Sequence, residues 1–128
     1  MRPIARNLYL VLAWLFVALL VVQVFLAGLG VFSSATSFVT HRDFGYLLEL
    51  FPVLLLVVGL VAGLGRRLAV IALVIFGLFL LQSVFVLVRD DAPQVAALHP
   101  VNGFLILLLA LFVARAAWLQ RSDVLAAV

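Results

Sequence analysis

Four long apolar runs, separated by short polar breaks, constrain this chain more than any other feature of its sequence. They cover about residues 8–32, 41–64, 68–88 and 95–119, and each reaches the roughly 20 residues that a helix needs to cross a bilayer. Hydrophobic residues make up 69% of the 128, which is more apolar surface than a soluble domain of this length can bury. Because lipid offers the backbone no hydrogen-bond partner, each run is predicted to be a helix.

The connections between these runs are short, which predicts that neighbouring helices pack antiparallel. Residues 1–128 are therefore expected to form one domain, an all-α integral membrane protein with an up-down four-helix bundle. The first run is much longer than the roughly 7–15 residues of a signal-peptide core. We expect it to remain as the first membrane-spanning helix.

The arginines predict an orientation. Two of the eight fall at one end of the predicted helices, beside three aspartates, and six fall at the other end. The positive-inside rule places the six, together with both chain termini, on the cytoplasmic side. A bacterial inner membrane is the expected location, and the basic charge does not indicate nucleic-acid binding. Tyr9, Trp14 and Trp118 could anchor the cytoplasmic interface. The six arginines are Arg2, Arg6, Arg66, Arg67, Arg115 and Arg121.

The two halves of the chain resemble each other. The segments that begin at His41 and His99 both read H-x-x-x-G, then an aromatic residue, then leucine. Gln23 and Gln82 each precede their histidine by 17 or 18 residues. This pattern predicts two parallel two-helix repeats, related by an axis along the membrane normal.

His41 and His99 are the main candidates for chemistry, because ionisable side chains inside a span are costly and usually functional. They open the second and fourth predicted helices from the same outer side, and these helices are diagonal partners in a square bundle. Adjacent helix axes lie ~8–10 Å apart, so the diagonal is about 11–14 Å. That gap suits two imidazoles that ligate the iron of one haem b from opposite sides. The alternative is that each histidine is a polar interface residue satisfied by water or a helix end.

Two pairs of neighbouring residues fit the same hypothesis. Gly45 and Gly103 each follow a histidine by four residues, on the same helical face, and could leave a flat surface for the macrocycle. The alternative is ordinary helix packing. Arg42 and Arg89 are the outer-side cations, and arginine pairs well with carboxylates such as haem propionates.

The remaining polar residues inside the predicted spans have weaker assignments. Glu49 lies eight residues past His41, about 12 Å deeper along a helix, and could serve a proton relay or a quinone site. It could equally be a protonated carboxyl bonded to Gln23 or Gln82, or one that faces a partner subunit. The glutamines could belong to the same site, but they and Asn102 fit interhelical hydrogen bonds better. Gly59-x-x-x-Gly63 could pack inside the bundle or between protomers.

The order of glutamine in one helix and histidine at the start of the next, repeated in both halves, resembles one four-helix half of haem A synthase. It is also similar to small bacterial four-span membrane proteins in which His-Pro-x-x-Gly opens the last helix. The resemblance covers about residues 6–115, rests on few residues, and implies that His41 and His99 are axial haem ligands. The chain lacks the second half and the outer-loop catalytic glutamate of haem A synthase, so synthase activity is not expected.

The leading hypothesis is a membrane cytochrome with a single haem b, in electron transfer or haem handling with a quinone or a redox protein as partner. The alternatives are a non-enzymatic accessory subunit that binds lipid, quinone or a protein, and a small proton-coupled transporter that uses Glu49. The sequence holds no phosphate-binding glycine loop, no nucleophile with a neighbouring base and no cysteine. It leaves open whether the protein is an enzyme and whether it forms oligomers.

Overall fold

A computed structural model of the chain describes residues 2–126, with side chains described for residues 2–120. This part of the chain is all-helical, and it contains four helical stretches that are long and apolar enough to cross a membrane. The stretches are Arg2–Phe32, Ser37–Ala62, Arg66–Leu87 and Pro93–Gln120. This architecture is compatible with a multi-pass membrane protein.

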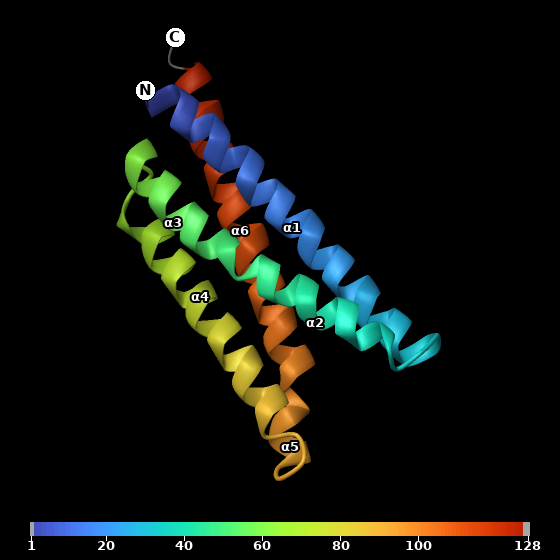
Figure 1. The fold of residues 1–128 in the computed structure, drawn as a ribbon. Helices are drawn as coiled ribbons and strands as arrows, with labels where there is room; N and C mark the ends of the chain where they lie inside the picture. Colours follow the sequence, from blue (N-terminus) through green and yellow to red (C-terminus); the bar gives the residue numbers. More distant parts are fainter. Residues whose placement is uncertain (1, 127–128) are drawn as a thin grey trace.

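The helices differ from the predicted runs mainly at their ends and at two interruptions (Figure 1). The first helix begins well before residue 8, because its polar first turn is also helical. The second begins at Ser37, so that His41 lies in its second turn and does not open it. In order, the helices are α1 (Arg2–Phe32), α2 (Ser37–Leu48), α3 (Leu50–Ala62), α4 (Arg66–Leu87), α5 (Pro93–Ala96) and α6 (Leu98–Ala126).

Proline accounts for both interruptions. Pro52 has no N–H to donate to the carbonyl of Leu48, and the second stretch breaks at Glu49 into α2 and α3. Pro100 likewise cannot bond to the carbonyl of Ala96, and the last stretch breaks at Ala97. The last stretch begins at Pro93, and after the interruption at Ala97 His99 lies in the first turn of α6.

A tight turn of residues 63–65 joins α3 to α4. Gly63 ends α3 in the left-handed conformation at φ 67°, and its N–H and that of Leu64 bond back to carbonyls of α3. Gly65 has φ 91°, which also favours glycine. Gly63 is therefore a helix terminator. Gly59 packs inside the bundle, because a Cβ there would lie 3.0 Å from a ring atom of Tyr9.

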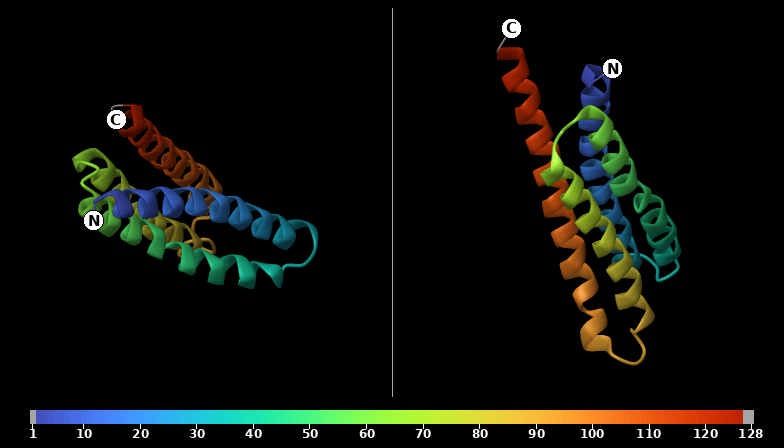
Figure 2. Two further views of the ribbon diagram at one scale, coloured as in Figure 1. Left: turned by 90° about the horizontal axis from the view of Figure 1, so that it is seen from above. Right: turned by 90° about the vertical axis from the view of Figure 1, so that its left-hand side faces the viewer.

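The four stretches form two antiparallel hairpins, α1 with α2–α3 and α4 with α5–α6. Helix α1 packs against α2, α3 and α6, and α4 packs against α3 and α6, whereas the backbones of α2 and α3 stay apart from that of α6 within the described chain. The second and fourth stretches are therefore diagonal, as predicted. The hairpins pack together toward the end that holds residues 63–65 and diverge toward the loops around residues 33–36 and 88–92 (Figures 1 and 2).

The buried core is concentrated on the packed side of the bundle. Tyr9, Ala13, Leu55, Ile75 and Val113 are almost wholly buried there. Burial of Tyr9 corrects its assignment as an interface anchor, since its ring packs on Gly59 inside the bundle. Trp14 and Trp118 are exposed. Most other large apolar side chains on the outer faces of the helices are also exposed, as in Phe25, Leu60 and Phe104.

Candidate functional site

His41 is held between α1 and α2 by contacts with Gln23. Its Nδ1 lies 3.1 Å from the main-chain oxygen of Gln23. A carbonyl oxygen can only accept, so Nδ1 carries the hydrogen and Nε2 is left as the acceptor nitrogen of the ring. The side-chain amide of Gln23 donates to the main-chain oxygen of His41 at 2.8 Å, and its nitrogen lies 3.5 Å from the His41 Nε2.

His99 repeats the main contact in the other hairpin. Its Nδ1 lies 3.4 Å from the main-chain oxygen of Gln82, the residue that corresponds to Gln23. By the same reasoning Nδ1 donates and the lone pair is on Nε2. Two histidines on different helices are thus held in one tautomer by the same kind of contact to the preceding helix.

The two imidazoles face each other across the bundle. Their ring centres are 6.1 Å apart, and their planes are inclined by 62°. No hydrogen bond joins the two rings in the described part of the chain. The edge of Phe38 covers His41 from the loop side, with ring centres 6.3 Å apart. The structure therefore brings together the two residues that the sequence paired.

In this structure Gly45 and Gly103 face glutamine side chains. A Cβ on Gly45 would lie 2.9 Å from the amide nitrogen of Gln23, and one on Gly103 would lie 3.3 Å from that of Gln82. Each glycine therefore makes room for a glutamine side chain from the preceding helix. A macrocycle surface at Gly45 and Gly103 stays a prediction, and their observed contacts are with the glutamines.

Both glutamines also carry an unsatisfied atom. Oε1 of Gln23 and Oε1 of Gln82 are buried without a hydrogen-bond partner. A buried acceptor left unpaired costs about 1–3 kcal/mol, so two of them at corresponding positions call for a donor. A water molecule or a ligand hydroxyl beside the histidines would satisfy them.

Aromatic and amide contacts join α1, α3, α4 and α6. The rings of Phe16 and Phe51 are stacked at 5.3 Å between centres, and Phe79 lies 6.2 Å from Phe16. Asn102, one turn after His99, donates to the main-chain oxygen of Leu78 at 2.8 Å. This bond confirms the predicted interhelical role of Asn102. The sequence did not single out these three phenylalanines, because nothing in their sequence neighbourhood distinguishes them from the other eight.

The two outer arginines are engaged with adjacent aspartates. Arg42 pairs with Asp43 at 2.9 Å, and Arg89 lies 3.7 Å from Asp90 and donates to the main-chain oxygen of Val86. All four side chains are largely exposed, so water screens these pairs and they contribute little to stability. Neither pair prevents the arginines from binding another carboxylate.

Glu49 stands apart from the histidine pair. It occupies the break between α2 and α3, is half-buried, and its carboxyl has no hydrogen bond or ion pair with another described residue. The expected bond to Gln23 or Gln82 is therefore not present. No group of three or more His, Cys, Asp or Glu side chains in the described chain could hold a metal ion.

The described chain is thus an all-helical protein with four helices able to cross a membrane and a histidine pair between its two hairpins. It belongs to a family of unknown function, DUF6220, whose model matches residues 23–88. That match includes Gln23, His41, Gly45 and Gln82, and it ends before His99. No curated protein and no solved structure matches the chain.

Proposed function

We propose that this protein is a four-span membrane protein that holds one haem b between His41 and His99, near its outer face, for electron transfer or haem handling. The observation that supports this most directly is the pair of facing imidazoles, 6.1 Å apart, contributed by two diagonal helices. Metal–imidazole bonds are about 2.0 Å long and a ring nitrogen lies about 1.1 Å from the ring centre. Two imidazoles on opposite sides of one metal therefore have centres about 6 Å apart.

The tautomers support the same assignment. Metal-ligating histidines usually donate their second ring N–H to a carboxylate or a main-chain carbonyl, which fixes the ring and leaves the other nitrogen for the metal. Both His41 and His99 donate Nδ1–H to a glutamine carbonyl, so both present Nε2. This tautomer is the one that two axial ligands of one iron would need.

The number of ligands favours a metal inside a macrocycle. Two imidazoles without a third ligating side chain nearby are too few for the four-coordinate sites that zinc prefers. A porphyrin brings its own four nitrogens and needs only axial ligands. With both axial positions filled, haem b supplies one-electron redox chemistry without binding a substrate. Arg42 and Arg89 are the residues proposed to hold its propionates.

The membrane placement rests on the surface and on the arginines. Large apolar side chains cover the outer faces of all four stretches. Such a surface is unfavourable in water and favourable in lipid. Arginines dominate the end that holds the 63–65 turn, which supports cytoplasmic termini in a bacterial inner membrane. The histidine pair then belongs to the outer half of the protein.

The corresponding contacts in the two hairpins support an origin by duplication. Gln23, His41 and Gly45 in one hairpin and Gln82, His99 and Gly103 in the other share two contacts: the histidine Nδ1 with the glutamine main-chain oxygen, and the glutamine amide beside the glycine. The likeness to half of haem A synthase supports the same ligand pair, but it does not extend to synthase activity. Two parallel repeats that each supply one histidine would give the site its two axial ligands.

The decisive experiment is the absorption spectrum of the purified protein, oxidised and then reduced with dithionite, after expression with added haem precursor. We expect a Soret band, resolved α and β bands on reduction, and about one haem per chain. His41→Ala and His99→Ala should each lose these bands, whereas Tyr46→Phe, on the exposed face of α2, should keep them. A colourless folded protein would refute the proposal, as would iron-free protein that contains copper.

A second candidate function rests on Glu49. Its carboxyl lies within an apolar stretch without a described partner, and ionisable side chains inside a span commonly serve proton pathways in pumps and transporters. The same carboxyl could dock a quinone, a lipid or a partner protein in an accessory subunit. If the protein is colourless, loss of proton-coupled uptake in Glu49→Gln liposomes would favour the transporter, and loss of a co-purifying partner would favour the accessory subunit.

A further inference from the structure

A groove at the opposite end of the molecule from the histidines has no role in the proposed haem site. It lies between the start of α4 and residues 112–119 of α6, and has a volume of about 510 Å³. Its α6 side is one helical stripe, because Phe112, Arg115, Ala116 and Leu119 are spaced three or four residues apart. Arg67 of α4 closes the groove from the other side.

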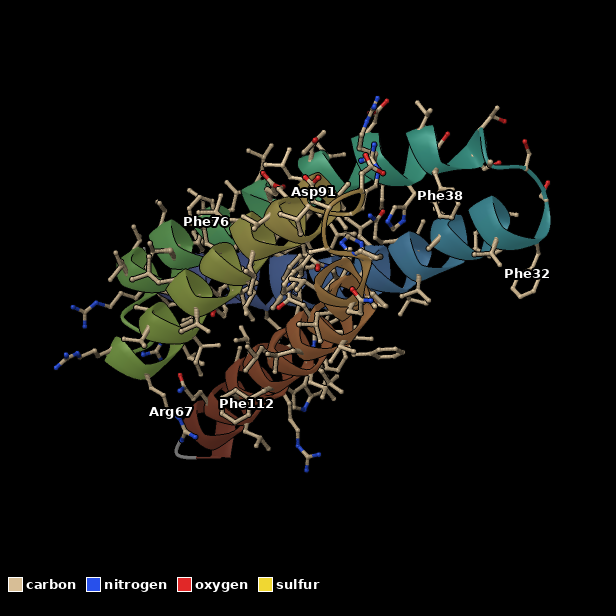
Figure 3. All side chains as sticks on the ribbon, turned by 90° about the horizontal axis from the view of Figure 1, so that it is seen from below. Phe32, Phe38, Arg67, Phe76, Asp91 and Phe112 are labelled. Carbon is tan, nitrogen blue, oxygen red and sulfur yellow. The ribbon has the colours of Figure 1, made fainter. Side chains whose placement is uncertain are left out.

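One arginine of the groove is held in place by an aromatic ring. The guanidinium carbon of Arg67 lies 4.9 Å from the centre of the Phe112 ring, and Figure 3 shows the two side chains together. The ring attracts the guanidinium through its positive charge, and the contact leaves the N–H groups able to donate hydrogen bonds. Arg67 is thus positioned with its donors available.

No acidic side chain neutralises this groove within the described chain. The acidic residues whose side chains are described are Asp43 in α2, Glu49 at the α2–α3 break, and Asp90 and Asp91 in the loop after α4, and none of them lines the groove. Neither Arg67 nor Arg115 forms an ion pair with a described residue. Two guanidinium groups around one groove therefore lack a counter-charge from the described protein, and an anion would supply it.

The depth of the groove matches the headgroup level of a bilayer. In the sequence the last apolar run gives way to polar residues at Gln120, and Arg115 lies five residues before it, which is about 7.5 Å along a helix. A long arginine side chain covers that distance and brings its charge to the interface. Phe112, Ala116 and Leu119 offer an apolar wall for an acyl chain beside the two charges.

The geometry points to a binding site for the phosphodiester headgroup of an anionic phospholipid, held by Arg67 and Arg115 with one acyl chain along α6. Basic pockets between spanning helices on the cytoplasmic side are suited to such headgroups. The inference rests on the proposed membrane placement and is independent of the haem. It assigns a lipid of the inner leaflet to the interface between α4 and α6.

The test is a titration of the detergent-purified protein with phosphatidylglycerol or phosphatidylcholine, with bound lipid counted by native mass spectrometry. The wild type should bind phosphatidylglycerol in preference. The double variant Arg67→Gln with Arg115→Gln should bind it about 25-fold more weakly, since a basic residue near a lipid surface contributes about fivefold. Its affinity for phosphatidylcholine should not change.

Two further variants distinguish binding in the groove from general attraction of the lipid to the positive charge at this end of the protein. Arg2→Gln with Arg66→Gln removes the same charge at the same end but outside the groove, and should lower the affinity much less. Phe112→Leu keeps all charges and should weaken phosphatidylglycerol binding a few-fold, because Arg67 loses its stacking partner. Circular dichroism of each variant verifies that the helices are intact.

Three results would overturn the inference: a groove variant with wild-type affinity, a control variant as weak as the groove variant, or displacement of the lipid by millimolar inorganic phosphate. The last result would identify the ligand as free phosphate. Carbonate extraction of native membranes tests the membrane placement separately. Release of the protein by carbonate would refute that placement, whatever lipid the protein prefers.

Discussion

Gln23 and Gln82 hold the histidines through main-chain oxygens, while their side chains fill the space beside Gly45 and Gly103. The glutamine, the histidine and the glycine therefore form one unit in each hairpin. A substitution at the glycine should act on the histidine indirectly, by moving the glutamine. This makes the two glycines positioning residues for the imidazoles.

We expect Gly45→Ala to disturb the site more than Gly103→Ala. The added Cβ would lie 2.9 Å from the Gln23 amide nitrogen in the first case, and 3.3 Å from the Gln82 amide nitrogen in the second. Overpacking of this kind costs about 1–3 kcal/mol, and Gly45→Ala should be nearer the upper value. The measurement is the thermal midpoint and the pigment content of each purified variant. A larger effect for Gly103→Ala would contradict the contact geometry.

Some of these residue roles were accessible from the sequence and others were not. The spacing of glutamine, histidine and glycine predicted that the histidines would meet, because polar residues at matching positions of two hairpins reach the same depth. It did not predict that the glutamine amide would occupy the glycine space, since that contact depends on the distance between two helices. The groove at Arg67 was missed because its arginines were used only for orientation.

At the scale of helices, α1 packs directly against α3 in the packed half of the bundle, through Tyr9 and Gly59. Tyr9 is wholly buried, and its ring edge lies where a side chain on Gly59 would begin. Its hydroxyl oxygen is buried without a hydrogen-bond partner. Arg6 adds a bond from its side chain to the main-chain oxygen of Ala62, at the end of α3.

We expect Gly59→Ala to lower the thermal stability of the detergent-solubilised protein, because its Cβ would lie 3.0 Å from a Tyr9 ring atom. The cost should be about 1–3 kcal/mol, which is a shift of several degrees for a protein of this size. Gly77→Ala in α4 is the matched control, since a Cβ there has no neighbour within 4 Å. Equal midpoints for the two variants would show that α1 and α3 can separate freely.

The sequence predicted the four apolar stretches, but it predicted their interruptions only in part. Length and hydropathy identify four runs, because a bilayer demands about 20 apolar residues whatever their order. Pro52 lies within an apolar run and leaves hydropathy unchanged, so the break at Glu49 was not predicted. Ser37 and Thr40 likewise concealed the start of α2, because polar residues there interrupt the apolar run although the helix has already begun.

At the scale of the whole molecule, the proposed topology can be measured directly because the chain has no cysteine. A single cysteine in the loop between α1 and α2, Ser34→Cys, should react with a membrane-impermeant maleimide in spheroplasts. A cysteine near the end of the last stretch, Gln120→Cys, should react only after the membrane is opened. The reverse pattern would place the histidine pair on the cytoplasmic side.

The divergence of the two hairpins has a consequence for how much of this protein a cell can maintain. A group that bridges His41 and His99 binds only while the hairpins keep their relative position, so it favours the folded state by mass action. At a free ligand concentration one thousand times the dissociation constant, that gain is about 4.1 kcal/mol. Chains made without the ligand would open more often and be cleared by proteases. The supply of cofactor would then set the abundance of the protein, with no change in its transcription.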